Sequence, residues 1–166
     1  MLSLLPTLVR PVRASDMERV RELARLKFRD VNQITTDGLA HWVADTNRVS
    51  PLLVDARSEA EFRVSHLPKA VHGESVQEVK RLAAGSDGQL RPVVVYCAVG
   101  YRSSALVQKL KRAGLTNVFS LDGSIFQWAN EGRDLYRGDD RVKAVHPHNH
   151  KWGQLLKPEY RADLPD

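Results

Sequence analysis

The segment PVVVYCAVGYRSSALVQKLKRAG, residues 92–114, places a strand, a short loop and a helix in direct succession. The run after Pro92 is apolar and rich in β-branched valine, which predicts a buried strand with Cys97 at its carboxyl end. From Ser103 onward the residues predict a helix that ends at Gly114. The apolar face of this helix consists of Leu106, Val107 and Leu110.

Similar units precede and follow this segment. Residues 33–36 (QITT) offer a short extended piece, and Thr36 can cap a helix that carries Leu39, Trp42 and Val43. Residues 51–57 (PLLVDAR) suit a strand buried on both faces, and Ser58 with Glu61 has the spacing of a capping box that opens a short helix. Further along, a helix is expected at 74–84, a strand at 117–121 (NVFSL) and a helix at 123–132.

This alternation predicts the α/β class, with a central parallel sheet of about five strands and helices on both faces. Right-handed crossovers bring the carboxyl ends of such strands to one edge of the sheet. Ligands bind at that edge in open parallel sheets, and Cys97 is expected there.

Both ends of the chain extend beyond this pattern. Ser15 and Glu18 have capping-box spacing, and a helix over 16–29 is expected to pack its apolar residues beside the core: Met17, Val20, Leu23 and Leu26. After Arg137 the pattern lapses, and we expect an extended tail that wraps the domain, with disorder as the alternative. The expected anchors of the tail are Trp152, Leu155 and Leu156. The expected divisions are therefore an N-terminal helical extension (1–31), a central domain (32–137) and a C-terminal tail (138–166).

Composition narrows the classes of protein that remain. One cysteine among 166 residues excludes an internal disulfide and a four-cysteine metal cluster, which favours a reducing, cytoplasmic setting. The net charge of +5 comes without an aromatic-interleaved basic patch, so no nucleic-acid partner is expected. No apolar run reaches the roughly 20 residues that a membrane span needs, and Pro6 interrupts the one near the start, so neither a membrane segment nor a cleaved signal is expected.

The loop after Cys97 changes the interpretation of this cysteine. A lone cysteine after an apolar strand is often a small buried hydrophobe. Here Ala98, Val99, Gly100 and Tyr101 separate strand from helix, and small residues with a glycine let the backbone turn several N–H groups toward the sulfur. The following helix adds the positive end of its dipole, and Arg102 adds a full charge. These features favour thiolate over thiol, and the same cradle would hold an anionic substrate.

Two chemistries use such a cradle. Cysteine phosphatases surround a phosphoryl group and place an arginine six positions after the cysteine. That position is Ser103 here, and Arg102 stands five positions after Cys97. The loop is thus better suited to a smaller group, such as a sulfur atom carried on the cysteine.

Three stretches together resemble a single-domain rhodanese. LLVDARSEAEFRVSHLPKAV (52–71) is similar to the family's strand, Asp-x-Arg, helix and His-x-Pro elements. YCAVGYRSSALVQKLKRAG (96–114) resembles its six-residue active-site loop, and VFSLDGSIFQWANEG (118–132) its closing strand and helix. Departures from the family pattern are Ser65, Lys69 and Ser124, at positions where the family often has glycine.

The resemblance implies a sulfurtransferase that needs no cofactor. The Cys97 thiolate would take the outer sulfur of a small anionic donor such as thiosulfate, and the resulting persulfide would pass that sulfur to cyanide, a thiol or a protein acceptor. Backbone N–H groups of the loop would stabilise the persulfide, and Arg102 would attract the donor. The loop residues are Ala98, Val99, Gly100, Tyr101, Arg102 and Ser103. Asp55 and Arg57 could brace this loop or form a purely structural ion pair.

Two alternative functions stay open, and the histidines are expected to play no part in catalysis. The loop could belong to a phosphatase or arsenate reductase, or the domain could be a non-enzymatic sulfur carrier or protein-binding module. His66 is expected to be structural rather than a catalytic base. His146, His148 and His150 alternate in the tail, but with no cysteine or carboxylate near them in sequence we expect no metal site.

Overall fold

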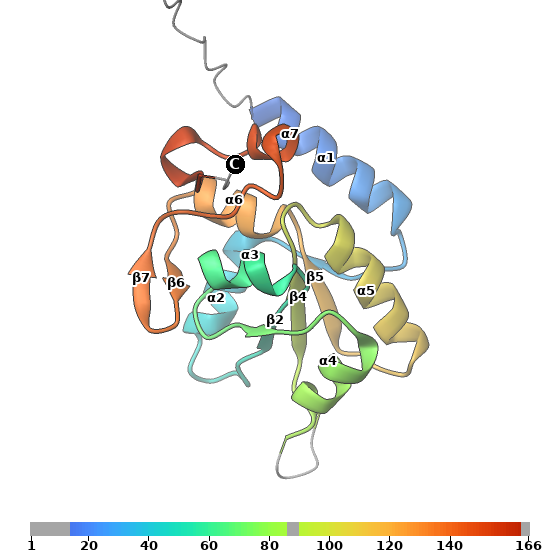
Figure 1. Ribbon diagram of the computed structural model, residues 1–166. Helices are drawn as coiled ribbons and strands as arrows, with labels where there is room; N and C mark the ends of the chain where they lie inside the picture. The colour runs from blue at the N-terminus through green and yellow to red at the C-terminus, as the bar shows by residue number, and fades with distance from the viewer. Residues whose placement is uncertain (1–13, 86–89, 164–166) are drawn as a thin grey trace, which may run out of the picture.

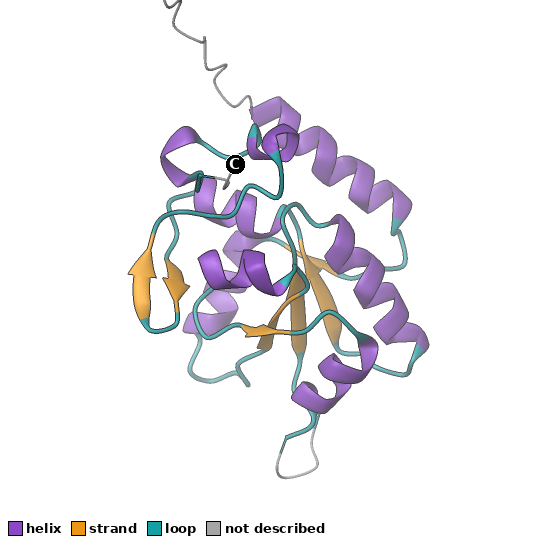
Figure 2. Cartoon of the chain, in the orientation of Figure 1, coloured by secondary structure: helices purple, strands orange, loops and turns teal. Residues whose placement is uncertain are grey.

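The computed structural model of the chain describes residues 14–85 and 90–163. Its centre is a parallel sheet with strand order β1-β5-β4-β2-β3. The strands are β1 (Gln33–Ile34), β2 (Leu52–Asp55), β3 (Val71–His72), β4 (Val93–Tyr96) and β5 (Val118–Leu121). Figure 2 shows these strands in the middle of the molecule with helices on both sides. The α/β prediction is therefore confirmed, although β3 was not expected as a strand.

Helices cover the sheet, and further elements follow it (Figure 1). The helices are α1 (Ala14–Lys27), α2 (Thr36–Ala44), α3 (Glu59–Val64), α4 (Val76–Ala83), α5 (Tyr101–Arg112) and α6 (Ser124–Asn130). After them come an antiparallel hairpin of β6 (Leu135–Arg137) and β7 (Asp140–Val142), a short helix α7 (His150–Gly153) and a 3₁₀ turn η1 (Pro158–Tyr160).

Alternate residues of the central strands pack into two separate cores, because successive side chains of a strand point to opposite faces. On one face, Leu52, Val54, Val93, Val95 and Val118 pack with apolar residues of α4 and α5. On the other face, Leu53, Val94, Tyr96 and Leu121 pack with residues of α1, α2 and α6. Since the sheet is covered on both faces, the central strands β2 and β4 are buried along their whole length and are mostly apolar, as the sequence indicated.

Several helix starts differ from the sequence prediction. The Ser58–Glu61 capping box is present, with Ser58 as the N-cap of α3. The cap of α2 is Thr35, whose hydroxyl accepts from the Gly38 N–H, so the expectation for Thr36 was wrong. Thr36 is instead buried and donates its hydroxyl to Glu131.

Two other helices begin earlier than expected. Helix α1 begins at Ala14, so Ser15 lies inside it and is not its N-cap. Helix α5 begins at Tyr101 rather than Ser103, with Gly100 as its N-cap. Tyr101 and Arg102 therefore belong to the first turn of α5, which fixes their direction relative to the loop.

The buried face of α1 also differs from the expectation. Met17, Ala24 and Phe28 are buried, but Leu23 is 65% exposed and Leu26 is 52% exposed. The two leucines were expected beside the core, and that prediction was wrong because the helix turns a different stripe toward the sheet. Residues 1–13 of the expected N-terminal extension lie outside the described residues.

The C-terminal tail packs on the same face as α1 and α6. Leu156 is fully buried, Leu155 is nearly so, and Trp152 packs against the core cluster that contains them. The segment is not extended throughout, since it forms β7, α7 and η1. The expected boundary between residues 137 and 138 falls inside the hairpin, because Arg137 is the last residue of β6. Figure 1 shows α7 close to α1, so segments from opposite ends of the chain meet.

Candidate active site

Cys97 directly follows β4 and is almost completely buried, at 1% exposed. The start of α6 holds its backbone: the Cys97 N–H donates to Ser124 Oγ at 3.1 Å, and the Cys97 carbonyl accepts from the Ile125 N–H at 3.1 Å. The next carbonyl, that of Ala98, accepts from the Phe126 N–H at 3.0 Å. The loop is therefore fixed to the helix that follows the neighbouring strand β5.

One backbone N–H of the loop donates to the sulfur. Gly100 N lies 3.2 Å from Cys97 Sγ, in a turn where Gly100 has a φ of 105°. That left-handed conformation costs an L-residue with a side chain, so glycine is needed here. Ser103 Oγ is a second donor, 3.6 Å from the sulfur. Several loop N–H groups were expected to point at the sulfur, whereas within the described residues the loop directs one N–H and one hydroxyl at Sγ.

A buried chain of hydroxyl groups extends from this second donor. Gln33 Nε2 donates to Ser104 Oγ (3.1 Å), Ser104 Oγ donates to Ser120 Oγ (3.0 Å), and Ser120 Oγ lies 2.9 Å from Ser103 Oγ. When Ser120 is the donor in the last pair, every group donates to the next one and Ser103 donates to Cys97 Sγ. Hydrogen bonds aligned in this way polarise one another. The chain therefore ends on the sulfur with its most positive hydrogen.

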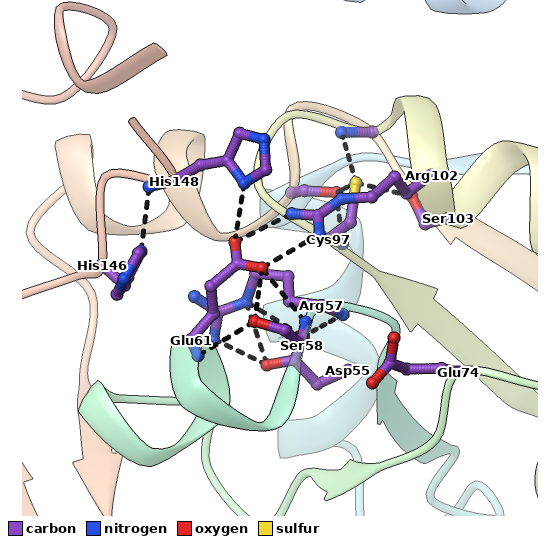
Figure 3. Close-up of polar contacts among 12 residues, drawn as sticks. Asp55, Arg57, Ser58, Glu61, Glu74, Cys97, Arg102, Ser103, His146 and His148 are labelled. Carbon is purple, nitrogen blue, oxygen red and sulfur yellow. Dashed lines mark hydrogen bonds and ion pairs between the residues drawn. The ribbon is translucent and has the colours of Figure 1, made fainter. Parts of the chain in front are cut away.

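Arg102 forms a two-pronged ion pair with Glu61 of α3 (Figure 3). Its Nη2 and Nη1 atoms lie 2.8 and 3.0 Å from the two carboxylate oxygens. Burial raises the pKa of Glu61, but the hydrogen bonds and charge of Arg102 and the Ser58 cap outweigh it and lower that pKa to about 2. Arg102 was expected to attract a donor anion, yet its charge is already matched by a carboxylate.

Asp55 and Arg57 form a fully buried ion pair with two contacts of 3.0 and 2.7 Å. Arg57 Nη2 also donates to the Ser65 carbonyl at 2.6 Å, and the guanidinium lies 5.9 Å from the centre of the Tyr96 ring. Burial lowers the pKa of Arg57, but Asp55 outweighs it, so the guanidinium stays charged. The pair thus braces the turn at Ser65 and packs against the residue before Cys97, without a hydrogen bond to the loop itself.

A pocket of about 390 Å³ opens above Cys97. Ala98, Val99, Tyr101 and Arg102 of the loop line it together with the cysteine. Its other walls come from α1 and from the C-terminal tail, through Val20, Leu23, His148 and Trp152. Sequence reasoning missed these four residues, because nothing in the sequence indicates that the two ends of the chain meet over the loop.

Two histidines of the tail, His146 and His148, lie on the side of Glu61 (Figure 3). His148 Nδ1 is 3.6 Å from a carboxylate oxygen of Glu61, so a carboxylate does lie near this tract, contrary to the sequence argument. Burial lowers the pKa of His146, and its Nδ1 accepts the His148 N–H at 3.0 Å. Among residues 14–85 and 90–163, no group of three or more His, Cys, Asp or Glu side chains is arranged to hold a metal ion.

The departures from the family pattern have structural explanations. Lys69 and Ser124 have φ values of 56° and 50°, so each adopts the left-handed conformation that glycine would adopt there. Ser124 adds a hydroxyl that accepts the Cys97 N–H and donates to the Leu121 carbonyl at 2.9 Å. His66 pairs its backbone N–H and carbonyl with Tyr136 and does not line the pocket above the cysteine.

Comparisons with known proteins give consistent results. Residues 35–131 match the family model described as a rhodanese-like domain. A sulfurtransferase of Allochromatium vinosum is 33% identical over 102 residues, which is 61% of this chain and 92% of that protein. Within the described residues, no helix is long and apolar enough to cross a membrane.

Two solved structures share the fold at low identity. A thiosulfate sulfurtransferase of Pseudomonas aeruginosa has a TM-score of 0.58 at 22% identity, over 82% of this chain and 26% of that chain. A Rhodopseudomonas palustris protein of unknown function, described as a possible tyrosine phosphatase, has a TM-score of 0.52 at 17% identity. The latter match covers 81% of this chain and all of the other.

Proposed function

We propose that this chain, which belongs to the rhodanese-like domain family, is a sulfurtransferase with Cys97 as its nucleophile. The observation that carries this proposal is the position of Cys97 Sγ. It lies at the base of a pocket, at the carboxyl end of β4, with the Gly100 N–H and the Ser103 hydroxyl directed at it. The relative from Allochromatium vinosum, itself named a sulfurtransferase, supports the same reaction class.

The proposed reaction has two steps that balance without an external oxidant. In the first, the Cys97 thiolate attacks the outer sulfur of a donor such as thiosulfate; an S–S bond forms on the enzyme, the donor's S–S bond breaks, and sulfite leaves with the electron pair. In the second, cyanide or a thiol attacks the outer sulfur of the persulfide, and Cys97 leaves as the thiolate. Donors 3.2 and 3.6 Å from Sγ would stabilise the Cys97 thiolate that attacks in the first step and leaves in the second.

The loop geometry argues against phosphoryl transfer. The arginine of the loop, Arg102, lies in the first turn of α5 and pairs with Glu61, so its guanidinium does not surround a phosphate site above the sulfur. The position at which phosphatases have arginine is the buried Ser103, which donates to Sγ. The proposed donor is a small anionic sulfur compound, and the proposed acceptor is a thiol or a protein. The proposed setting is cytoplasmic, because a reducing compartment keeps the single cysteine as a thiol.

Intact mass measurement after incubation with thiosulfate tests the proposal. We expect the protein to gain the mass of one sulfur atom, to lose it on addition of cyanide with formation of thiocyanate, and to stay unmodified when Cys97 is replaced by serine. If several donors leave the wild type unmodified, it is not a sulfurtransferase acting alone. Loading only in the presence of a protein partner would indicate a carrier module, and hydrolysis of an aryl phosphate without thiocyanate formation would indicate a phosphatase.

A further inference from the structure

Part of the wall of the pocket above Cys97 comes from residues outside the family match. The matched segment ends at residue 131 and begins at residue 35, whereas Val20 and Leu23 belong to α1, and His148 and Trp152 to the tail. The matched segment supplies the sulfur and its hydrogen-bond donors. The segments on either side of the match add Val20, Leu23, His148 and Trp152 to the loop residues that a bound molecule would touch beyond the reacting atom.

This surface is mostly apolar and wider than a small inorganic donor requires. Val20, Leu23, Val99 and Trp152 face a space of about 390 Å³, within the range of about 300–1,000 Å³ that is usual for organic ligands. Leu23 is 65% exposed, so its side chain is not committed to the core. A thiosulfate ion offers no apolar surface for these side chains to cover, while an aryl or alkyl group does.

The charges at the pocket also disfavour a doubly charged donor. Arg102 lines the pocket, but both prongs of its guanidinium bind Glu61 at 2.8 and 3.0 Å. His148, the other basic residue of the lining, lies 3.6 Å from the same carboxylate. A dianion that entered the pocket would lose its hydration and gain cations already matched by a buried carboxylate.

We propose that the pocket binds a sulfane-sulfur donor that carries an apolar organic group, and that Leu23 and Trp152 determine this specificity. The inference rests on the proposed function. For a thiosulfonate R–SO₂–S⁻, the Cys97 thiolate attacks the terminal sulfur, a new S–S bond forms on Cys97, the donor's S–S bond breaks, and the sulfinate R–SO₂⁻ leaves with the electron pair. For an organic persulfide R–S–SH, the leaving group is the thiolate R–S⁻. In both cases the group R lies against the apolar walls.

A matched pair of donors tests this specificity. Methanethiosulfonate and benzenethiosulfonate carry the same reacting group and the same single charge, and they differ only in the apolar group. Thiocyanate formation with cyanide as acceptor gives kcat/KM for each donor, and in a two-step exchange this quantity reports the donor step alone. We expect the benzene compound to be used at least about tenfold more efficiently, since burial of an aromatic ring contributes more than burial of a methyl group.

Helix α1 offers a matched control for the walls. Leu23→Ser removes apolar surface from the pocket and should lower the benzene-to-methane ratio by about three- to fivefold. Leu26→Ser alters an equally exposed leucine of the same helix that does not line the pocket, and should leave the ratio unchanged. Trp152→Ala should lower the ratio further, with its thermal unfolding midpoint recorded to show that the variant is folded.

The outcomes separate this inference from the function on which it rests. A wild-type ratio near one, or an equal ratio in the wild type and the Leu23→Ser and Trp152→Ala variants, would overturn the inference while sulfur transfer itself stands. Failure of every donor to load sulfur on Cys97 would instead overturn the proposed function. A ratio that falls as much in Leu26→Ser as in Leu23→Ser would refute the assignment to the pocket wall.

Discussion

Replacement of Glu61 by glutamine tests whether the Glu61 carboxylate neutralises the charge of Arg102 and stabilises the fold. The carboxylate of Glu61 accepts from Arg102 at 2.8 and 3.0 Å and from the Ser58 N–H and hydroxyl at 3.0 Å each, and it lies 3.6 Å from His148. A glutamine keeps the size and one acceptor oxygen, so the cap of α3 can persist. The substitution removes the negative charge and leaves the guanidinium without its counter-ion.

The pKa of Glu61 sets an upper limit for the stability that the charge contributes. A pKa lowered from 4.5 to about 2 corresponds to about 3 kcal/mol in the free energy of unfolding. The side chain of Arg102 is 37% exposed, so solvent screens part of this interaction, and we expect a loss of about 1–2 kcal/mol in Glu61→Gln at pH 7. For a chain of this length the loss corresponds to roughly 3–6 °C in the unfolding midpoint.

The same reasoning gives the pH dependence. Because folding lowers the pKa of Glu61, the contribution of the carboxylate is fully present above pH 4.5 and is lost as the pH falls toward 2. Urea unfolding of the wild type and of Glu61→Gln between pH 7 and pH 2 measures this contribution. The difference in stability should be constant from pH 7 to pH 5 and should shrink below that. Equal stabilities at pH 7, or a gap that stays constant down to pH 2, would refute the assigned ion pair.

The substitution should also change the use of donors. With Glu61 neutral, the Arg102 guanidinium is free to donate to an anion in the pocket, and a charge-assisted hydrogen bond contributes about 1.5 kcal/mol. We therefore expect kcat/KM for thiosulfate to rise about tenfold in Glu61→Gln. The ratio between benzenethiosulfonate and methanethiosulfonate should stay as it is in the wild type. An unchanged value for thiosulfate would show that the ion pair does not limit binding of anions.

Three further substitutions test the loop and its support. Gly100→Ala should lower the free energy of unfolding in urea by about 1–2 kcal/mol, because φ is 105° while the atom nearest to an added Cβ, the Leu121 carbonyl oxygen, lies 3.6 Å away; an unchanged midpoint would contradict a strained backbone. Ser103→Ala should slow alkylation of Cys97 by iodoacetamide at pH 7 about fivefold through loss of one hydrogen bond, and an equal rate would show that the hydroxyl does not act on the sulfur. Arg57→Met should lower the free energy of unfolding by roughly 3–5 kcal/mol, since it leaves the Asp55 carboxylate buried and unpaired. Most of this stability should be recovered in the Arg57→Met, Asp55→Leu double variant.

The sequence predicted the sheet because its central strands β2 and β4 are buried on both faces and therefore form runs of mainly apolar residues. Cys97 could be placed at the binding edge for the same reason, since it directly follows such a run. The short strand β3 (Val71–His72) was missed because two residues carry no detectable pattern. The choice between Thr35 and Thr36 as the cap of α2 could not be made locally, because Thr36 is held by Glu131 from another helix.

The chemistry around the sulfur was only partly predictable. Gly100 and Ser103 belong to the loop and could be named, whereas Ser120 lies in a neighbouring strand and reaches the site only through the fold. Glu61 was assigned to a capping box, which is correct, but its pairing with Arg102 across 41 positions depends on how α3 and α5 face each other. Leu23 was expected in the core because periodicity gives the width of an apolar stripe and not its direction.

The meeting of α1 and α7 above Cys97 also sets the order in which the site can be built. Helix α1 is synthesised before β4, and α7 follows α1 by more than a hundred residues, so the second wall of the pocket is completed only when the tail docks. Loop closure over that distance is entropically costly and is compensated only by late contacts such as those of the buried Leu156. A nascent chain that has formed β4, α5 and α6 therefore already holds its thiol in the loop, whereas the pocket walls contributed by the tail are still absent. On the proposed specificity, the walls that select a donor are therefore completed only after the thiol is in place.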